Sequence, residues 1–293
     1  MKRSIILATA LCTASLSAPA ALAQSDQSFA GDAISIQDFV GRIEVRESQS
    51  SQISVSVRRG DGEYTAPLVT ESGGRVLIDG ETSMRGLQCS RRGGVVRVGT
   101  RFGSRRPITD YPTLVIEAPA SLALSIDDSL FVGETGNLGS ASIEVDRCGD
   151  FAMGDIAENA SFEVNGSGDL TVGSIGGDAR FGINGSGDID ARSVGDLRVS
   201  INGSGDIEIA TQTGAFTADI NGSGDINIHN GRAQPFNVGI NGSGDINHGG
   251  EVVDADVDIN GSGDVSAGEF SGSLRWSDSR GRVRTRSHDH DEG

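Results

Sequence analysis

The chain has 293 residues, of which 43 are Gly and only 4% are aromatic, and its formal net charge is −17. The glycines lack a Gly-X-Y period, which excludes a collagen triple helix. The acidic balance excludes nucleic acid as the main partner, because a phosphate backbone requires a basic protein face.

Residues 1–23 have the pattern of a secretory signal peptide. Lys2 and Arg3 form a basic start, and an apolar stretch covers residues 5–16. Ala21-Leu22-Ala23 matches a small-x-small cleavage site, so the mature chain is predicted to begin at Gln24. The apolar stretch is too short for a transmembrane helix, and no later segment is long enough to span a bilayer. We therefore predict an exported protein without a membrane span, in the periplasm or at the cell surface.

Residues 24–116 are predicted to form an irregular β region at which the fold begins. Runs rich in β-branched residues predict strands at 33–45, 52–58, 76–79, 95–98 and 113–116. Residues 85–106 contain seven Arg and no acidic residue, whereas residues 117–269 contain 26 acidic residues and five Arg. The basic segment is interpreted either as a flap that lies on or is screened by the acidic region, or as an interaction device.

Two cysteines follow the signal peptide, Cys89 in the basic segment and Cys148 near the start of the repeats. In an oxidising compartment such a pair predicts one disulfide, with two separate buried thiols as the alternative. A Cys89–Cys148 bond would attach the basic segment to the first coils of the acidic region.

Residues 117–281 contain an internal repeat with a nearly constant period. The pentapeptide Asn-Gly-Ser-Gly-Asp begins at residues 165, 184, 202, 221, 241 and 260, and degenerate copies flank these six. Atypical end copies are typical of stacked arrays, because terminal units face water on one side. Residues 282–293, which are polar, are predicted to be a disordered tail.

Apolar and polar residues alternate on both sides of the pentapeptide. Phe181 and Ile183 precede one copy, and Ile207 and Ile209 follow the next. This period of two predicts two strands per unit. A unit of this size cannot bury its apolar side alone, so we predict an all-β fold: a parallel, right-handed β-helix, or β-solenoid, with coils of about 19 residues. An antiparallel hairpin array or sandwich is the alternative, because Asn-Gly favours hairpins.

The pentapeptide is interpreted as a tight corner, because Gly at its second and fourth positions permits positive φ. A bent, continuous strand with both Gly pointing inward is the alternative. In either case the Asn residues stack into an amide ladder.

The final residue of the pentapeptide forms a row of carboxylates along the solenoid. Its members are weak candidates to bind Ca²⁺ between successive coils: Asp169, Asp188, Asp206, Asp225, Asp245 and Asp264. The favoured interpretation is that each carboxylate instead accepts N–H groups of its own turn and points to solvent, with salt screening the remaining repulsion.

The repeat region does not suggest an active site. Paired carboxylates occur only as the repeated Asp. A residue that recurs in every coil is expected to have a structural role and not a catalytic one. A cleft that cleaves polysaccharides usually offers aromatic platforms, whereas the chain has a single Trp. We therefore predict no enzymatic activity, no catalytic residue and no cofactor other than Ca²⁺.

Several segments together resemble the putative auto-transporter adhesin head GIN domain family. They are Phe39-Val40-Gly41 through Val45, Ile53-Ser54-Val55-Ser56-Val57, residues 114–119, and the reiterated Gly-Ser-Gly-Asp-Ile. The resemblance implies an exported parallel β-helix with no established activity and contributes no catalytic residues.

We therefore predict an exported, non-enzymatic β-solenoid that serves as a binding or structural module of the envelope or cell surface. Its expected partner is an envelope or surface glycan or protein. Two alternatives remain: a Ca²⁺-dependent extracellular or periplasmic binding protein, and a carbohydrate-active β-helix enzyme.

Overall fold

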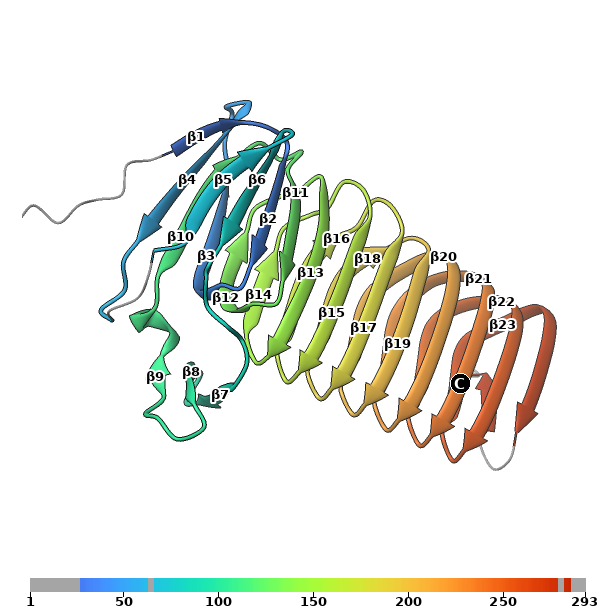
Figure 1. The fold of residues 1–293 in the computed structure, drawn as a ribbon. Helices are drawn as coiled ribbons and strands as arrows, with labels where there is room; N and C mark the ends of the chain where they lie inside the picture. The colour runs from blue at the N-terminus through green and yellow to red at the C-terminus, as the bar shows by residue number, and fades with distance from the viewer. Residues whose placement is uncertain (1–26, 63–65, 279–281, 286–293) are drawn as a thin grey trace, which may run out of the picture.

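The computed structural model describes residues 27–62, 66–278 and 282–285, which form a β-solenoid (Figure 1). The predicted signal peptide lies outside the described residues. Successive repeats pair in parallel and in register, so that Val164 lies beside Ile183 and Ile183 beside Ile201. The predicted parallel solenoid is therefore confirmed, and the repeats do not form a hairpin array.

Each coil contributes one strand to each of two sides of the solenoid. From the N-terminal end, the first side contains β6 (Arg75–Asp79), β2 (Ala33–Gln37), β11 (Ala123–Asp127), β13 (Ser140–Arg147), β15 (Ala160–Gly166), β17 (Ala179–Gly185), β19 (Leu197–Gly203) and the second halves of β20 (Ile207–Gly222), β21 (Ile226–Gly242), β22 (Ile246–Gly261) and β23 (Asp264–Asp278).

The second side is built in the same way from the strands that follow each corner. It contains β10 (Thr113–Ala118), β3 (Val40–Glu47), β12 (Leu130–Thr135), β14 (Asp150–Met153), β16 (Asp169–Ser174), β18 (Ile189–Val194), the first halves of β20–β23, and β24 (Arg282–Thr285).

The N-terminal coils do not follow the order of the chain. β2 lies between β6 and β11, and β3 lies between β10 and β12. The chain therefore forms the second coil first, then the outermost coil, and only then the third. Antiparallel strands close this end: β4 (Gln52–Arg58) pairs with β10, β1 (Gln27–Ala30) pairs with β4, and β5 (Leu68–Ser72) pairs with β6.

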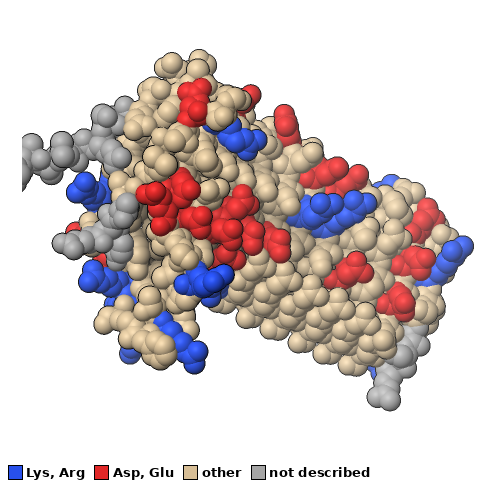
Figure 2. Space-filling model, in the orientation of Figure 1, with Lys and Arg blue, Asp and Glu red and all other residues tan. Residues whose placement is uncertain are grey.

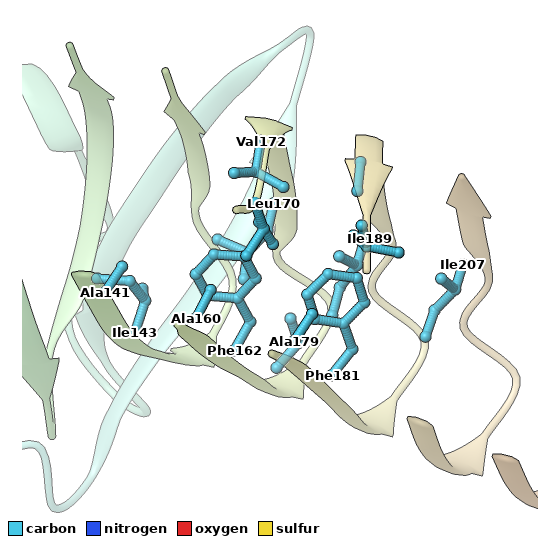
Figure 3. Close-up of a cluster of buried hydrophobic side chains, with 14 of the residues drawn as sticks. Ala141, Ile143, Ala160, Phe162, Leu170, Val172, Ala179, Phe181, Ile189 and Ile207 are labelled. Atoms are coloured by element: carbon cyan, nitrogen blue, oxygen red, sulfur yellow. The ribbon is translucent and has the colours of Figure 1, made fainter. Parts of the chain in front are cut away.

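A continuous apolar core runs along the solenoid axis between the two sides. Figure 3 shows Phe162 and Phe181 on neighbouring coils, and their rings stack with centroids 5.4 Å apart. In these coils the residue two positions earlier is Ala, whereas in a later coil Phe216 occupies that earlier position and Ala218 follows it. Large and small residues thus alternate between adjacent rows, which keeps the interior closely packed.

The structure differs most clearly from the sequence predictions at two places. The single strand predicted at 33–45 is two strands, because the chain turns a corner at Asp38, which has a φ of 51°. The disordered tail predicted from residue 282 begins too early, since β24 pairs with the start of β23 through residues 282–285. Residues 286–293 lie outside the described residues.

The register of the stack can be tested with two neighbouring substitutions. Ile201 is fully buried, so Ile201→Asp places a charge in the apolar row and should destabilise the fold by at least about 4 kcal/mol. Ser200 is exposed and lies beside Asp219, so Ser200→Asp should cost about 1 kcal/mol through repulsion. Thermal unfolding of both variants is the measurement, and equal losses would refute this register.

Candidate functional site

The pentapeptide forms the corner between the two sides of each coil. β15 ends at the first Gly of one copy, Gly166, and β16 begins at the Asp, Asp169. The first Gly of the next copy, Gly185, has a φ of 148°, and a Cβ there would collide with the carbonyl oxygen of Gly166 one coil earlier. The corner interpretation is therefore confirmed, and Gly is required because neighbouring coils approach too closely for a side chain.

The Asn residues that open the pentapeptides form the predicted amide ladder. The Asn184 Nδ2 donates to the Asn165 Oδ1 at 2.9 Å, and the Asn202 Nδ2 donates to the Asn184 Oδ1 at 3.1 Å. The contact recurs from Asn221 to Asn202 and from Asn260 to Asn241. Each amide thus joins two coils along the axis.

The Asp residues that close the pentapeptides form a second ladder. From Asp188 onwards, the backbone N–H of each Asp donates to the Oδ1 of the Asp one coil earlier, at 2.7 to 3.3 Å. The five bonds join the series Asp169, Asp188, Asp206, Asp225, Asp245 and Asp264, whereas the Asp169 N–H donates to the Gly149 carbonyl. This differs from the predicted capping of the carboxylate's own turn. In-register stacking places the next coil's N–H beside each carboxylate, so the hydrogen bond forms between coils.

The Ca²⁺ sites proposed for this row remain a prediction. The structure brings the six Asp residues into one line, with one oxygen of each of five carboxylates accepting an N–H. Among the described residues, no three His, Cys, Asp or Glu side chains are grouped so that they could hold a metal ion. Any Ca²⁺ would have to use the remaining carboxylate oxygens of successive coils.

A salt comparison distinguishes screening of this row from cation sharing. We expect NaCl to raise the melting temperature as much as CaCl₂ at equal ionic strength, because screening alone relieves the repulsion between carboxylates. Asp206→Asn with Asp225→Asn keeps an oxygen acceptor and removes two central charges, so this variant should melt higher at low salt. A Ca²⁺-specific increase that vanishes in the double variant would instead establish shared cations.

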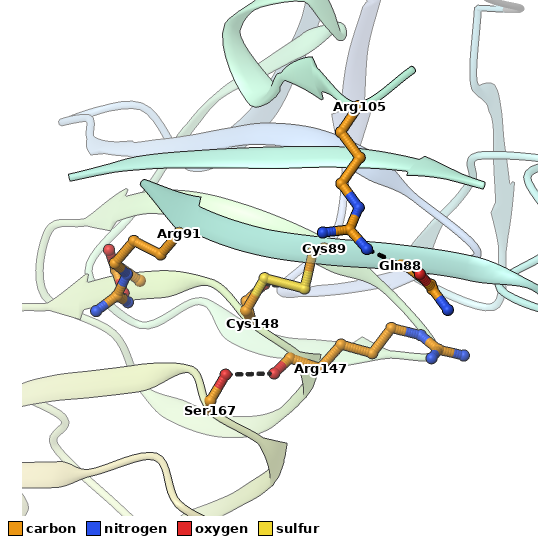
Figure 4. The surroundings of a disulfide bond; sticks show 8 residues. Gln88, Cys89, Arg91, Arg105, Arg147, Cys148 and Ser167 are labelled. Atoms are coloured by element: carbon orange, nitrogen blue, oxygen red, sulfur yellow. Dashed lines mark hydrogen bonds and ion pairs between the residues drawn. A yellow bond between two sulfur atoms is a disulfide. The ribbon is translucent and has the colours of Figure 1, made fainter. Parts of the chain in front are cut away.

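The Arg-rich segment forms a small antiparallel sheet, here called the basic finger (residues 85–107). It contains β7 (Leu87–Arg92), β8 (Val95–Thr100) and β9 (Arg106–Pro107). The predicted disulfide is confirmed: Cys89 of β7 is bonded to Cys148 at the corner before β14 (Figure 4). The disulfide therefore attaches the finger to the start of the repeat region.

A single Arg connects the finger with the row of Asp carboxylates. The Arg91 guanidinium forms an ion pair with Asp150 and a second one, of 2.8 Å, with the Oδ2 of Asp169. The other six arginines of the finger have no carboxylate within 4.0 Å among the described residues. Within the described part of the chain, Arg91 is thus the only arginine of the finger that forms an ion pair with the acidic region, and the other six have no carboxylate partner.

An acidic cluster lies on the first side, between the finger and the regular coils. Burial raises the pKa of Glu144, and the charges of Asp146 and Glu163 raise it further. Burial and the charge of Asp128 likewise raise the pKa of Asp146. The Asn165 Nδ2 donates to the Glu144 Oε1 at 2.6 Å. Burial and mutual repulsion therefore both disfavour the charged forms of these carboxylates in the folded state.

The cost of charging Glu144 predicts that Glu144→Gln raises the stability of the fold by an amount that depends on pH. A pKa raised in the folded state disfavours folding above that pKa, and the cost disappears as pH falls towards the ordinary Glu value of 4.5. The variant should therefore melt higher than the unmodified protein at pH 7 and equally at about pH 4. Exposed Glu158→Gln is the charge-matched control, and a Glu144→Gln gain that did not change with pH would contradict this explanation.

Two arginines that the sequence analysis did not single out stand side by side on the first side. Arg180 of β17 pairs in register with Arg198 of β19, and both side chains are exposed. Neither has a carboxylate within 4.0 Å in the part of the chain that the structure describes. Both stand four residues before the Asn of their pentapeptide, so alignment of the repeats could have revealed the pair.

A hollow of about 350 Å³ adjoins the two arginines, here called the Arg180–Arg198 hollow. Its polar lining also includes Asn159, Ser161, Asp178, Asp196 and Thr217. Figure 2 shows a basic patch on this face of the solenoid, bordered by acidic side chains. The hollow therefore offers paired guanidinium groups and flanking hydrogen-bonding groups to a ligand.

A family model described as "Putative auto-transporter adhesin, head GIN domain" matches residues 42–231 and 197–273. The chain belongs to this family. The GIN-domain match begins within β3 and leaves out β2, but it includes the basic finger and the Arg180–Arg198 hollow. Within the described residues, no helix is long and apolar enough to cross a membrane.

Two solved structures are similar to this GIN-domain chain. One is a putative adhesin from Bacteroides fragilis NCTC 9343, with 14% identity and a TM-score of 0.42. The other is a putative lipid binding protein from Parabacteroides distasonis ATCC 8503, with 18% identity and a TM-score of 0.41. In both comparisons the match covers 89% of this chain and 96% of the other. No curated protein matches the sequence.

Proposed function

We propose that this GIN-domain protein is an exported, non-enzymatic, adhesin-like module that binds an acidic glycan of the cell surface or envelope. The family description supports an adhesin-like role, and the Cys89–Cys148 disulfide supports an oxidising compartment outside the cytoplasm. The observation that carries the choice of ligand is the unpaired Arg180–Arg198 pair beside a hollow.

Adjacent guanidinium groups favour an anionic ligand. Parallel strands lie about 4.8 Å apart, so Arg180 and Arg198 repel each other by roughly 1 kcal/mol in water. A carboxylate placed between them relieves this repulsion and can accept two parallel N–H bonds from a planar guanidinium. The hollow has the volume of a small-molecule site, which accommodates a sugar residue that carries such a carboxylate.

The groups beside the hollow favour binding over catalysis. Glycosidic bond cleavage uses two carboxyl groups in defined acid and base roles. Asp178 and Asp196 are exposed, and one oxygen of Asp196 already accepts the Ala215 N–H at 2.8 Å. His248, the one buried His of the repeats, belongs to the apolar interior, where burial lowers its pKa. These features support a recognition surface.

The proposal is tested by glycan binding with charge-matched variants. Arg180→Ala with Arg198→Ala should weaken binding to uronic acid glycans by at least about tenfold, because two charge-assisted contacts are lost. Arg192→Ala with Arg275→Ala removes the same charge elsewhere and should bind like the unmodified protein. Equal losses in the two variants, or equal binding to neutral glycans, would refute a site at the hollow.

The proposed location is tested separately by cell fractionation. We expect the protein in the periplasmic or surface fraction, with its first 23 residues removed and with no free thiol when it is purified without reductant. Recovery of an uncleaved, reduced chain from the cytoplasm would refute export without bearing on the glycan measurement.

A further inference from the structure

The tip of the basic finger presents a fully exposed aromatic ring. Phe102 lies in the loop between β8 and β9 and is 96% exposed. The phenylalanines of the solenoid core, such as Phe131, Phe162 and Phe216, are at most 1% exposed. A single exposed ring is common on protein surfaces, so Phe102 carries weight only together with the groups beside it.

Arginines without a carboxylate partner in the described chain lie close to this ring in the sequence, and one of them, Arg105, donates to the Gln88 side chain at 2.8 Å. The Arg101 guanidinium lies 5.7 Å from the centre of the Phe102 ring, and Arg105 and Arg106 follow within four residues. The Arg97 Nη1 donates to the backbone carbonyl of Arg105 at 3.3 Å. No carboxylate lies within 4.0 Å of these four arginines among the described residues. The tip thus combines one apolar ring with concentrated positive charge.

The base of the finger is firmly attached to the solenoid. The Cys89–Cys148 disulfide and the ion pairs of Arg91 with Asp150 and Asp169 connect β7 to the repeat region. On the same face of the finger as the disulfide, Val96 and Val98 are buried in a second small core that includes Cys148. The Tyr111 hydroxyl donates to the Val98 carbonyl at 3.2 Å. The tip is therefore presented by a supported structure and projects at the N-terminal end of the solenoid (Figure 1).

We propose that the basic finger docks the protein on an anionic phospholipid surface, with Phe102 inserted at the boundary between headgroups and acyl chains. Aromatic rings favour this boundary, and each arginine near an anionic bilayer adds to the attraction. A soluble polyanion would satisfy the arginines but would leave Phe102 in water, so the ring decides in favour of a membrane.

The charge of the rest of the chain orients the docked molecule. Residues 117–269 contain 26 acidic residues and five Arg, so an anionic surface repels the solenoid and attracts only the finger. The solenoid and its Arg180–Arg198 hollow then extend away from the bilayer. This inference goes beyond the proposed glycan binding and does not depend on it, because the two surfaces share no residue.

Vesicle flotation measures the predicted docking. The intact protein, purified without reductant, should bind vesicles of about 30% phosphatidylglycerol in phosphatidylcholine and should not bind phosphatidylcholine alone. Phe102→Ala should weaken binding about tenfold, because the apolar insertion is lost. The triple variant Arg101→Gln, Arg105→Gln and Arg106→Gln should weaken it roughly 100-fold, through three lost attractions.

Matched controls separate docking by the finger from general effects. Arg180→Gln, Arg198→Gln and Arg275→Gln remove the same charge from the solenoid and should not weaken vesicle binding. Leu68→Ala removes another exposed apolar side chain, which lies on β5, and should have no effect. Equal loss in the finger and solenoid variants, or no binding of the unmodified protein to anionic vesicles, would overturn the proposal.

A fluorescent variant tests insertion of the ring directly. Phe102→Trp should show a blue-shifted emission on anionic vesicles, whereas the unmodified protein, whose only Trp is Trp276 at the far end of the solenoid, should not shift. Two results would overturn membrane insertion and show that the finger binds polyanions in general. One is the absence of an emission shift for Phe102→Trp on anionic vesicles. The other is that Phe102→Ala binds both anionic vesicles and a soluble acidic polysaccharide as well as the unmodified protein does. Neither result would bear on the separate prediction that the Arg180 and Arg198 variants lose glycan binding.

Discussion

In-register stacking of parallel strands is the constraint on which the rest of this structure depends. Neighbouring coils lie about 4.8 Å apart, so a residue of one coil meets its repeat counterpart in the next. Inward positions therefore become apolar rows, and the pentapeptide becomes rows of Asn, Gly and Asp. The Gly rows follow from the close approach of the corners. Within the Asn row, and separately within the Asp row, residues of neighbouring coils hydrogen-bond to each other along the axis.

The same constraint makes charge costly wherever it repeats. The Asp row places like charges on successive coils, and each carboxylate is offset in part by the N–H it accepts from the next coil. Arg91 neutralises the start of this row by contacting Asp150 and Asp169. The charges of Arg180 and Arg198, and of the finger tip, have no such partner in the described chain. We therefore place the proposed ligand and lipid contacts at these two surfaces, where charge is unbalanced.

The N-terminal region closes one end of the solenoid and makes this end different from the other. β4 and β5 pair antiparallel to the outermost strands β10 and β6, and β1 pairs with β4, so these three strands extend the sheet at this end. The segment between β6 and β10 leaves the stack and forms the basic finger, and the Cys89–Cys148 disulfide attaches this finger to the start of the repeat region. One end of the molecule thus carries the proposed membrane contact, while the regular coils carry the hollow.

The sequence by itself determined the coil period, the inward rows such as Ile183 and Ile201, the amide ladder and the pairing of Cys89 with Cys148. These features follow from short-range alternation and from a repeat that places identical residues in identical environments. It did not determine that β2 and β3 are inserted between strands that follow 42 to 90 residues later, because no repeated motif marks these pairings. Nor did it distinguish an Asp that accepts an N–H from its own turn from one that accepts it from the next coil. The unpaired state of Arg180 and Arg198 and the exposure of Phe102 were likewise decided only by the tertiary structure, since both depend on which side chains the fold leaves without neighbours.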